Sequence, residues 1–128
     1  MKTVLITGAS AGFGKLVAEK LLAKGYTVYA AARRVERMQD LEAKGAHVMH
    51  MDVTDNESVK AGVGRVLEEQ QRIDVLFNNA GYGSYGTIED IPLEEIQRQY
   101  DVNVFGMGRL IQAVLPQMRQ QRSGTIIN

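Results

Sequence analysis

Short apolar runs alternate with longer stretches of helical period along the whole chain, and this alternation constrains the fold more than any other feature. It predicts βαβ units, in which helices cover both faces of a parallel sheet. Because crossovers are right-handed, we expect a doubly wound α/β sheet of order 3-2-1-4-5, with a ligand at the carboxyl ends of the first and fourth strands. The candidate strands are Thr3 to Thr7, Thr27 to Ala31, His47 to Met51, Asp74 to Asn78 and Thr125 to Asn128.

Apolar residues at helical spacing place helices between these strands. The first helix is expected from about Phe13 to Leu21 and the second from about Val35 to Ala43. Gly25 and Gly45 follow them, where a left-handed residue would end a helix. The pattern from Thr54 to Glu57 predicts a capping box at the start of the third helix.

A long helical stretch occupies the last third of the chain. Pro92 is expected at its first helical position, and apolar spacing carries the helix to about Gln121. Helix-breaking residue types predict irregularities at Gly106, Gly108 and Pro116.

Charge and cysteine content exclude several classes of partner. Fifteen basic and fifteen acidic residues balance to zero with no block of like charge, so we expect neither a nucleic-acid nor a membrane partner. The absence of cysteine excludes disulfides, thiolate metal sites and a cysteine nucleophile, and it fits a cytoplasmic protein. His47 and His50 lie near Asp52 but have no third ligand at metal-site spacing, so no metal is expected.

A glycine-rich turn joins the first strand to the first helix, with the sequence Thr7-Gly8-Ala9-Ser10-Ala11-Gly12-Phe13-Gly14. Its three glycines allow a tight turn and let backbone amides and the helix N-terminus face a pyrophosphate. The spacing differs from G-x-G-x-x-G and lacks the lysine of a P-loop. Alone, the turn is equally compatible with a plain structural turn, and its place after the first strand favours a nucleotide site.

Two motifs in this order resemble those of the short-chain dehydrogenase/reductase family. Thr7-Gly8-x-x-x-Gly12-x-Gly14 resembles the family's cofactor motif, and Asn78-Asn79-Ala80-Gly81 resembles its second signature. Asp52-Val53 and Asn103-Val104-Phe105-Gly106 also match, so the resemblance covers the whole chain. It implies one Rossmann-like dinucleotide-binding domain over residues 1–128 and a homo-oligomer, either a dimer or a tetramer, in the full-length protein.

The resemblance also implies a cofactor site. Asp52 and Val53 would hold the adenine ring, while Asn79, Ala80 and Gly81 would pass beside the adenine ribose and the nicotinamide side. The alternative for this last segment is a strand end followed by an ordinary turn. From the glycine-rich turn, the expected cofactor-binding residues are Gly8, Ser10, Gly12, Phe13 and Gly14.

The end of the second strand bears on the choice between NAD and NADP. An NAD-preferring site needs a carboxylate there, whereas the sequence continues from Ala32 directly to Arg33 and Arg34. We expect NADPH, with Arg33 bidentate on the 2′-phosphate and Arg34 either a second donor or simply solvated. Many NADP-preferring family members have a basic residue at the position of Ala11, and Lys15 is not expected to replace it.

The resemblance implies four catalytic groups, of which this chain supplies one. Family members reduce a carbonyl or oxidise an alcohol with a tyrosine, a lysine four residues later, a serine and an asparagine. Asn103 matches the asparagine of the proton relay, although a buried, satisfied asparagine is the alternative. None of the five tyrosines has a lysine four residues on. Because the sequence stops at Asn128 inside a strand, we expect a fragment of a longer enzyme, inactive by itself.

The predicted function is therefore an NADPH-dependent oxidoreductase that moves hydride between nicotinamide and a small carbonyl compound or secondary alcohol. One alternative is a non-catalytic NAD(P)-binding module or an engineered half-domain scaffold. A methyltransferase-like domain would fit the glycine turn but not Arg33 with Asn78-Asn79-Ala80-Gly81. Tyr82, Ser84 and Tyr85 are candidates for a substrate pocket, or members of an ordinary surface loop.

Overall fold

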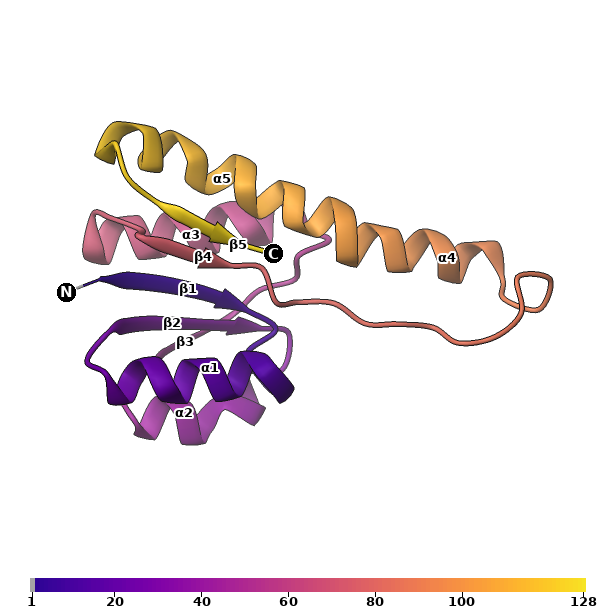
Figure 1. Cartoon of the computed structure of the whole chain (residues 1–128), viewed down its shortest axis with the longest axis horizontal. Helices are drawn as coiled ribbons and strands as arrows, with labels where there is room; N and C mark the ends of the chain where they lie inside the picture. Colours follow the sequence, from indigo (N-terminus) through magenta and orange to yellow (C-terminus); the bar gives the residue numbers. More distant parts are fainter. Residues whose placement is uncertain (1) are drawn as a thin grey trace.

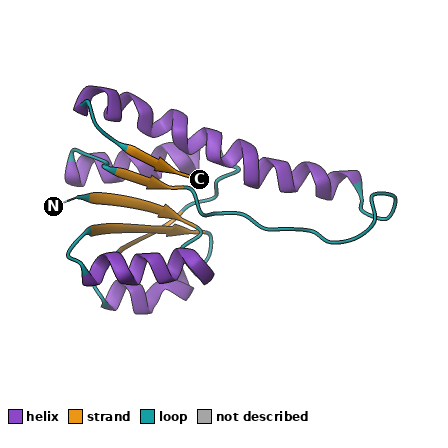
Figure 2. Cartoon of the chain, in the orientation of Figure 1, coloured by secondary structure: helices purple, strands orange, loops and turns teal. Residues whose placement is uncertain are grey.

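The computed structural model describes residues 2–128, which form a parallel five-stranded sheet with helices on both faces (Figures 1 and 2). The strand order is β3-β2-β1-β4-β5, which confirms the doubly wound topology predicted from the alternation. The strands are β1 (Thr3–Thr7), β2 (Thr27–Ala32), β3 (His47–His50), β4 (Val75–Phe77) and β5 (Thr125–Ile127).

Helices cover the sheet in two groups. On one face lie α1 and α2, and on the other lie α3 and α5 (Figure 1). No helix within residues 2–128 is long and apolar enough to cross a membrane. The helical segments are α1 (Gly12–Ala23), the 3₁₀ turn η1 (Val35–Met38), α2 (Gln39–Ala43), α3 (Asn56–Gln70), α4 (Leu93–Tyr100), the π-helical turn η2 (Asp101–Phe105) and α5 (Gly106–Gln121).

Strand β1 divides the hydrophobic core into two layers. All five of its residues are buried, and their side chains alternate between the two faces. Val4 and Ile6 belong to the core with Ala18 of α1, whereas Leu5 belongs to the core with Val63 of α3. A central strand covered on both sides must be apolar at nearly every position, which explains the unbroken run at the start of the sequence.

The predicted helix ends are partly confirmed. Gly25 and Gly45 follow α1 and α2 with φ values of +84° and +103°, as expected for left-handed C-terminal residues. The second predicted helix divides into η1 and α2. Pro92 is the N-cap of α4 rather than its first helical residue.

The capping box predicted at Thr54 is wrong. Asp55 is the N-cap of α3, and its side chain accepts hydrogen bonds from the N–H groups of Glu57 and Ser58. The hydroxyl of Thr54 instead donates to Asp52 at 2.7 Å. Helix α3 therefore begins one residue later than a Thr54 cap requires.

The long helical stretch is interrupted once by the π turn η2. In this turn the N–H of Gly106 donates to the carbonyl of Asp101, an i to i+5 bond. Gly106 is also close to the loop after β3, because a Cβ atom at Gly106 would lie 2.9 Å from Cγ2 of Val53. The irregularity predicted at Gly106 thus takes the form of a π turn that ends there, while Pro116 lies within α5.

Candidate functional site

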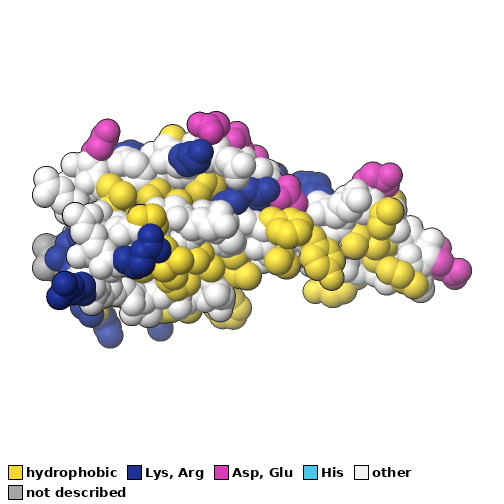
Figure 3. Space-filling model, turned by 90° about the horizontal axis from the view of Figure 1, so that it is seen from above, with side chains coloured by type: hydrophobic (Ala, Val, Ile, Leu, Met, Phe, Trp, Pro, Cys, Tyr) yellow, Lys and Arg dark blue, Asp and Glu magenta, His cyan; other side chains and the backbone are white. Residues whose placement is uncertain are grey.

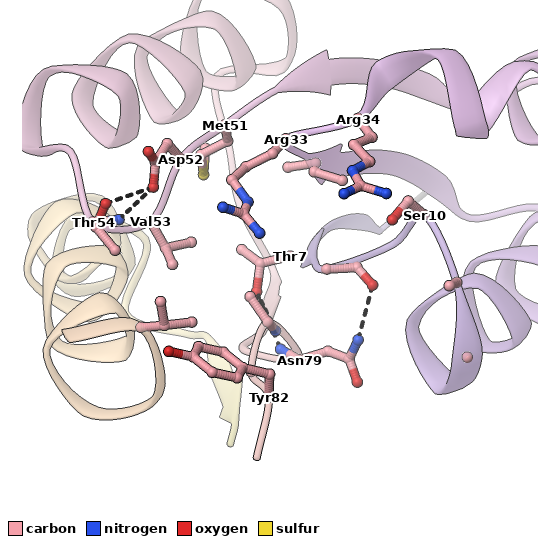
Figure 4. A pocket seen from close by; sticks show the side chains of 18 of the residues that line it. Thr7, Ser10, Arg33, Arg34, Met51, Asp52, Val53, Thr54, Asn79 and Tyr82 are labelled. Atoms are coloured by element: carbon pink, nitrogen blue, oxygen red, sulfur yellow. Dashed lines mark hydrogen bonds between the residues drawn. The ribbon is translucent and has the colours of Figure 1, made fainter. Parts of the chain in front are cut away.

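The carboxyl ends of four neighbouring strands open onto one cleft with a volume of about 1110 Å³ (Figure 4). Its walls come from the loops after β1, β2, β3 and β4 and from one side of α4 and η2. This is the edge where parallel sheets bind ligands. All of the predicted site residues line the cleft except Gly14 and Asn103.

The turn after β1 forms the first wall. Gly8 and Gly12 adopt φ values of +64° and +59°, which strongly favour glycine. Ala11, the N-cap of α1, offers no side-chain acceptor to the first-turn amides, and no acidic residue lies in that turn. Because Ala11, Gly12 and Phe13 line the cleft, the positive end of α1 is open to an anion.

Gly8 and Gly14 let this turn pack directly against the turn after β4. A Cβ atom at Gly8 would lie 2.8 Å from Cα of Ala80, and one at Gly14 would lie 2.4 Å from Nδ2 of Asn79. That amide nitrogen donates to the carbonyl of Gly8 at 3.1 Å. Gly14 therefore lies behind the cleft surface and serves the contact between the two motifs.

Thr7 joins the same two motifs, a role that the sequence analysis missed. Its buried hydroxyl oxygen accepts hydrogen bonds from the N–H groups of Asn79 at 3.1 Å and Ala80 at 3.0 Å. Nothing local to Thr7 in the sequence indicates this, because its partners lie more than 70 residues away.

Three arginines line the cleft where β2 ends. Arg33 reaches over the cleft toward Thr7, while Arg34 turns toward Ser10 (Figure 4). Arg37 also lines the cleft and was not predicted, although its place four residues after Arg33 was a usable signal. Within residues 2–128 none of the three forms an ion pair with a carboxylate. Their positive charge is therefore available to a ligand.

Lys15, which was not expected to bind the cofactor, forms an ion pair outside the cleft. Its ammonium group pairs with Asp40 of α2 at 2.5 Å and does not line the cleft. Hydrogen bonding to Asp40 raises the pKa of Lys15, so the lysine remains charged within this pair.

The loop after β3 forms the opposite wall. Asp52 accepts hydrogen bonds from the N–H of Thr54 at 2.9 Å and from its hydroxyl. The hydroxyl bond, the backbone bond and the charge of Arg33 hold the pKa of Asp52 below its ordinary value. The Asp52 carboxylate is therefore held in place by Thr54 and stays ionised at neutral pH. The buried side chain of Val53 adds an apolar surface beside it.

Tyr82, in the turn after β4, and Arg98, on α4, line the remaining wall. The Arg98 guanidinium carbon lies 5.6 Å from the centre of the Tyr82 ring, a cation–π distance. Burial and the nearby carboxylate of Glu95 raise the pKa of Tyr82. Its hydroxyl oxygen is buried without a hydrogen-bond partner among the described residues.

The turn after β4 is fastened to the helical arm, which is formed by α4 and η2, through Asn103, Gln99 and Glu95. The side-chain amide of Asn103 accepts a hydrogen bond from the N–H of Tyr82 and donates one to the carbonyl of Tyr82. Gln99 accepts from the N–H of Ser84, and Glu95 accepts from its hydroxyl, both at 2.9 Å. Of the three candidates for a substrate pocket, Tyr82 lines the cleft, Ser84 is engaged in these bonds, and Tyr85 is 97% exposed.

The comparisons with known proteins agree with this geometry. A family model described as short chain dehydrogenase matches residues 2–128. The 3-ketodihydrosphingosine reductase of Bacteroides thetaiotaomicron is 42% identical over 98% of this chain and 45% of its own length. The NADPH-dependent 3-dehydrocapnine reductase of Ornithobacterium rhinotracheale is 38% identical over 90% of this chain and 42% of its own length.

A solved structure shows the same fold. The alcohol dehydrogenase of the archaeon Thermococcus sibiricus, complexed with 5-hydroxy-NADP, superposes with a TM-score of 0.90 and 32% identity. The match covers 99% of this chain and 57% of that structure, and the chain spans less than half the length of the two curated relatives above. With a family model matched over residues 2–128, the chain belongs to the short-chain dehydrogenase family.

Proposed function

We propose that the cleft binds NADPH and that the chain is the cofactor-binding part of an oxidoreductase. The enzyme would transfer hydride between the nicotinamide and a small carbonyl compound or secondary alcohol. The observation that carries the proposal is the cluster of Arg33, Arg34 and Arg37, which lines the cleft and forms no ion pair with a carboxylate of the described residues.

The shape and the donors of the cleft fit a dinucleotide phosphate. The open N-terminus of α1 and the left-handed Gly8 and Gly12 leave backbone groups accessible to a pyrophosphate. Ser10 and Phe13 border the same region. Phe13 is 79% exposed, so a bound cofactor would cover an aromatic face that otherwise contacts solvent.

The choice of NADPH over NADH rests on the end of β2. Ala32 precedes Arg33 where a carboxylate would repel a 2′-phosphate, and a guanidinium fork matches that group bidentately. Asp52 lies on the far wall, where its carboxylate suits the exocyclic amine of adenine as an acceptor. A relative named as NADPH-dependent and a neighbour complexed with 5-hydroxy-NADP support the same choice.

When bound, the nicotinamide supplies or accepts the hydride. In this proposal the chain's own residues bind and orient it: Val53 packs beside the adenine, and Asn79, Ala80 and Gly81 hold the strand-end turn along which the cofactor lies. The proton-relay role of Asn103 stays a prediction, since both polar atoms of its amide are bonded to Tyr82. The family's tyrosine and lysine pair is absent from this sequence, and we expect counterparts in the half of the relatives that the chain does not match.

A homo-oligomer is also part of the proposal. The helical arm exposes a series of apolar side chains, and hydrophobic atoms gather on its visible face in Figure 3. An exposed apolar stripe of this kind favours a partner surface. The residues are Leu93, Tyr100, Val104 and Phe105.

Calorimetric titration of the chain with NADPH and with NADH tests the proposal, after circular dichroism has shown that the chain is folded. We expect tighter binding of NADPH. Equal affinity for both cofactors would contradict the role of Arg33, and absence of binding by the folded chain would contradict the cofactor site. The rival function, a non-catalytic NAD(P)-binding module or half-domain scaffold, would also bind the cofactor, and it is distinguished by the absence of the serine and of the tyrosine and lysine pair from the full-length protein.

A further inference from the structure

Arg109 of α5 joins three separate segments with one guanidinium group. Its Nη1 donates to the carbonyl of Val53 at 3.0 Å, and its Nε donates to Oδ1 of Asn56, at the start of α3, at 2.9 Å. Its Nη2 pairs with the carboxylate of Asp101 at 2.7 Å, and Nη1 also contacts the Asp101 carbonyl at 3.4 Å. The loop after β3, the first turn of α3 and the π turn η2 therefore share a single anchor.

The anchor lies directly behind the cleft. Val53 and Asp101 both line the cleft, whereas Arg109 does not. The Asp101 carbonyl is also the acceptor of the π-turn bond from Gly106, so Arg109 supports the irregular turn at its first residue. Gly106 in turn allows the close approach of Val53, since any Cβ there would meet Cγ2 of Val53 at 2.9 Å.

We propose that Arg109 is a positioning residue for the cofactor, which sets the width of the adenine end of the cleft by holding the Val53 carbonyl against the π turn. The inference rests on the proposed function, because it assigns the wall formed by Val53 and Asp101 to the adenine. π turns are rare and occur often at functional sites, and here the turn and the loop it faces are joined by the same side chain.

The geometry requires arginine at this position. Three donors of one planar group point to three acceptors on different segments, and a lysine ammonium on a flexible stem does not reproduce that fork. The Arg109 and Asp101 side chains are 23% and 38% exposed, so their charge attraction alone contributes little. The expected effect of Arg109 therefore comes from where it holds Val53.

The test measures the affinity of Arg109→Gln for ADP-ribose and for 2′-phospho-ADP-ribose by calorimetry. We expect both ligands to bind about tenfold more weakly, with the ratio between them unchanged, because Arg109 acts beside the adenine and away from the 2′-phosphate. Arg109→Lys keeps the positive charge but not the three-donor fork, so it should bind both ligands as weakly as Arg109→Gln.

Two matched variants separate positioning from general stability. Arg119→Gln removes an exposed arginine of the same helix and should leave binding unchanged. Arg72→Gln breaks the pair with buried Asp74 just before β4, at the end of the strand away from the cleft, and should lower the thermal midpoint without changing affinity. Loss of affinity in Arg72→Gln equal to that in Arg109→Gln would overturn the inference, as would unchanged binding by Arg109→Gln. A wild-type chain that binds neither NADPH nor the two fragments would instead remove the proposed function itself.

Discussion

The side-chain amide of Asn103 brackets the backbone of Tyr82, accepting from its N–H at 3.0 Å and donating to its carbonyl at 2.6 Å. The π turn places Asn103 at this position, facing the turn that follows β4. Gly81 is part of the same contact, since a Cβ atom there would lie 3.1 Å from Oδ1 of Asn103. The amide therefore holds the turn in the way that a neighbouring strand would.

Replacement of Asn103 by alanine should loosen this turn. Both backbone groups of Tyr82 lose their partner, so we expect faster amide hydrogen exchange at Tyr82 and a loss of stability on the order of 1–2 kcal/mol. Asn103→Asp keeps the acceptor and should preserve much of the protection of the Tyr82 amide. Gln112→Ala, at an exposed position of α5, serves as the control. An unchanged rate of amide hydrogen exchange at Tyr82 in Asn103→Ala would contradict the role of Asn103 in holding the Tyr82 backbone.

Replacement of Arg33 by alanine should reduce the preference for NADPH. Loss of a bidentate contact to the 2′-phosphate predicts roughly 10- to 100-fold weaker NADPH binding with little change for NADH, measured by calorimetric titration. Arg119→Ala removes the same charge from a distant exposed site and controls for net charge. Equal losses for both cofactors would assign Arg33 a role unrelated to the phosphate.

Replacement of Gly12 by valine should abolish binding of both cofactors and leave the sheet folded. A Cβ at Gly12 meets no atom within 4 Å, so the cause is the φ of +59°, which a β-branched residue does not tolerate. The turn would shift where α1 meets the pyrophosphate, while circular dichroism should remain that of the wild type. Gly108→Val in α5, where an added Cβ also meets open space, is the control. Retained binding by Gly12→Val would place the nucleotide elsewhere.

Arg72 and Asp74 should make stability depend on pH. Hydrogen bonds from Arg72 and from the N–H of Thr3 hold the pKa of Asp74 below its ordinary value of 3.8, against the opposing effect of burial. In the unfolded chain the carboxyl recovers its ordinary pKa and binds protons first as the pH falls. The stabilisation is therefore complete above the ordinary pKa and is lost as pH falls through the folded pKa.

Arg72→Gln should lower the free energy of unfolding at pH 7 by roughly 1–3 kcal/mol, because the buried carboxylate then keeps only the bond from Thr3. The variant should also lose less stability than the wild type between pH 6 and pH 3, as measured by urea denaturation. Parallel curves for the two proteins would exclude the pair as a source of the pH dependence.

The strand order could be predicted from the sequence because it depends on features that are local and repeated. A β1 strand buried on both faces needs an unbroken apolar run, and left-handed residues after α1 and α2 need Gly25 and Gly45. The start of α3 was harder, because Thr54 and Asp55 are both good N-caps. Thr54 donates its N–H and its hydroxyl to Asp52 in a local turn, which leaves Asp55 as the cap.

The contacts within the cleft could be predicted less well than its location. Most of the predicted site residues line the cleft, because glycines, arginines and strand-end asparagines stand out in the sequence. Gly106 indicated an irregularity in the helix but not its π geometry, and nothing in the sequence around Arg109 indicated that its side chain joins three segments. The geometry around Arg109 depends on Val53 and Asn56, which lie more than 50 residues earlier in the chain.

The hydroxyl of Thr7 fixes the positions of the two motifs relative to each other. One oxygen accepts hydrogen bonds from two consecutive amides of the turn after β4. The lack of side chains at Gly8 and Gly14 lets the two turns approach closely. Neither motif therefore has a shape that is independent of the other. A chimaera that joins the first motif of one relative to the second motif of another would therefore keep the two turns in place only where the first segment carries a hydroxyl at position 7 and glycines at positions 8 and 14.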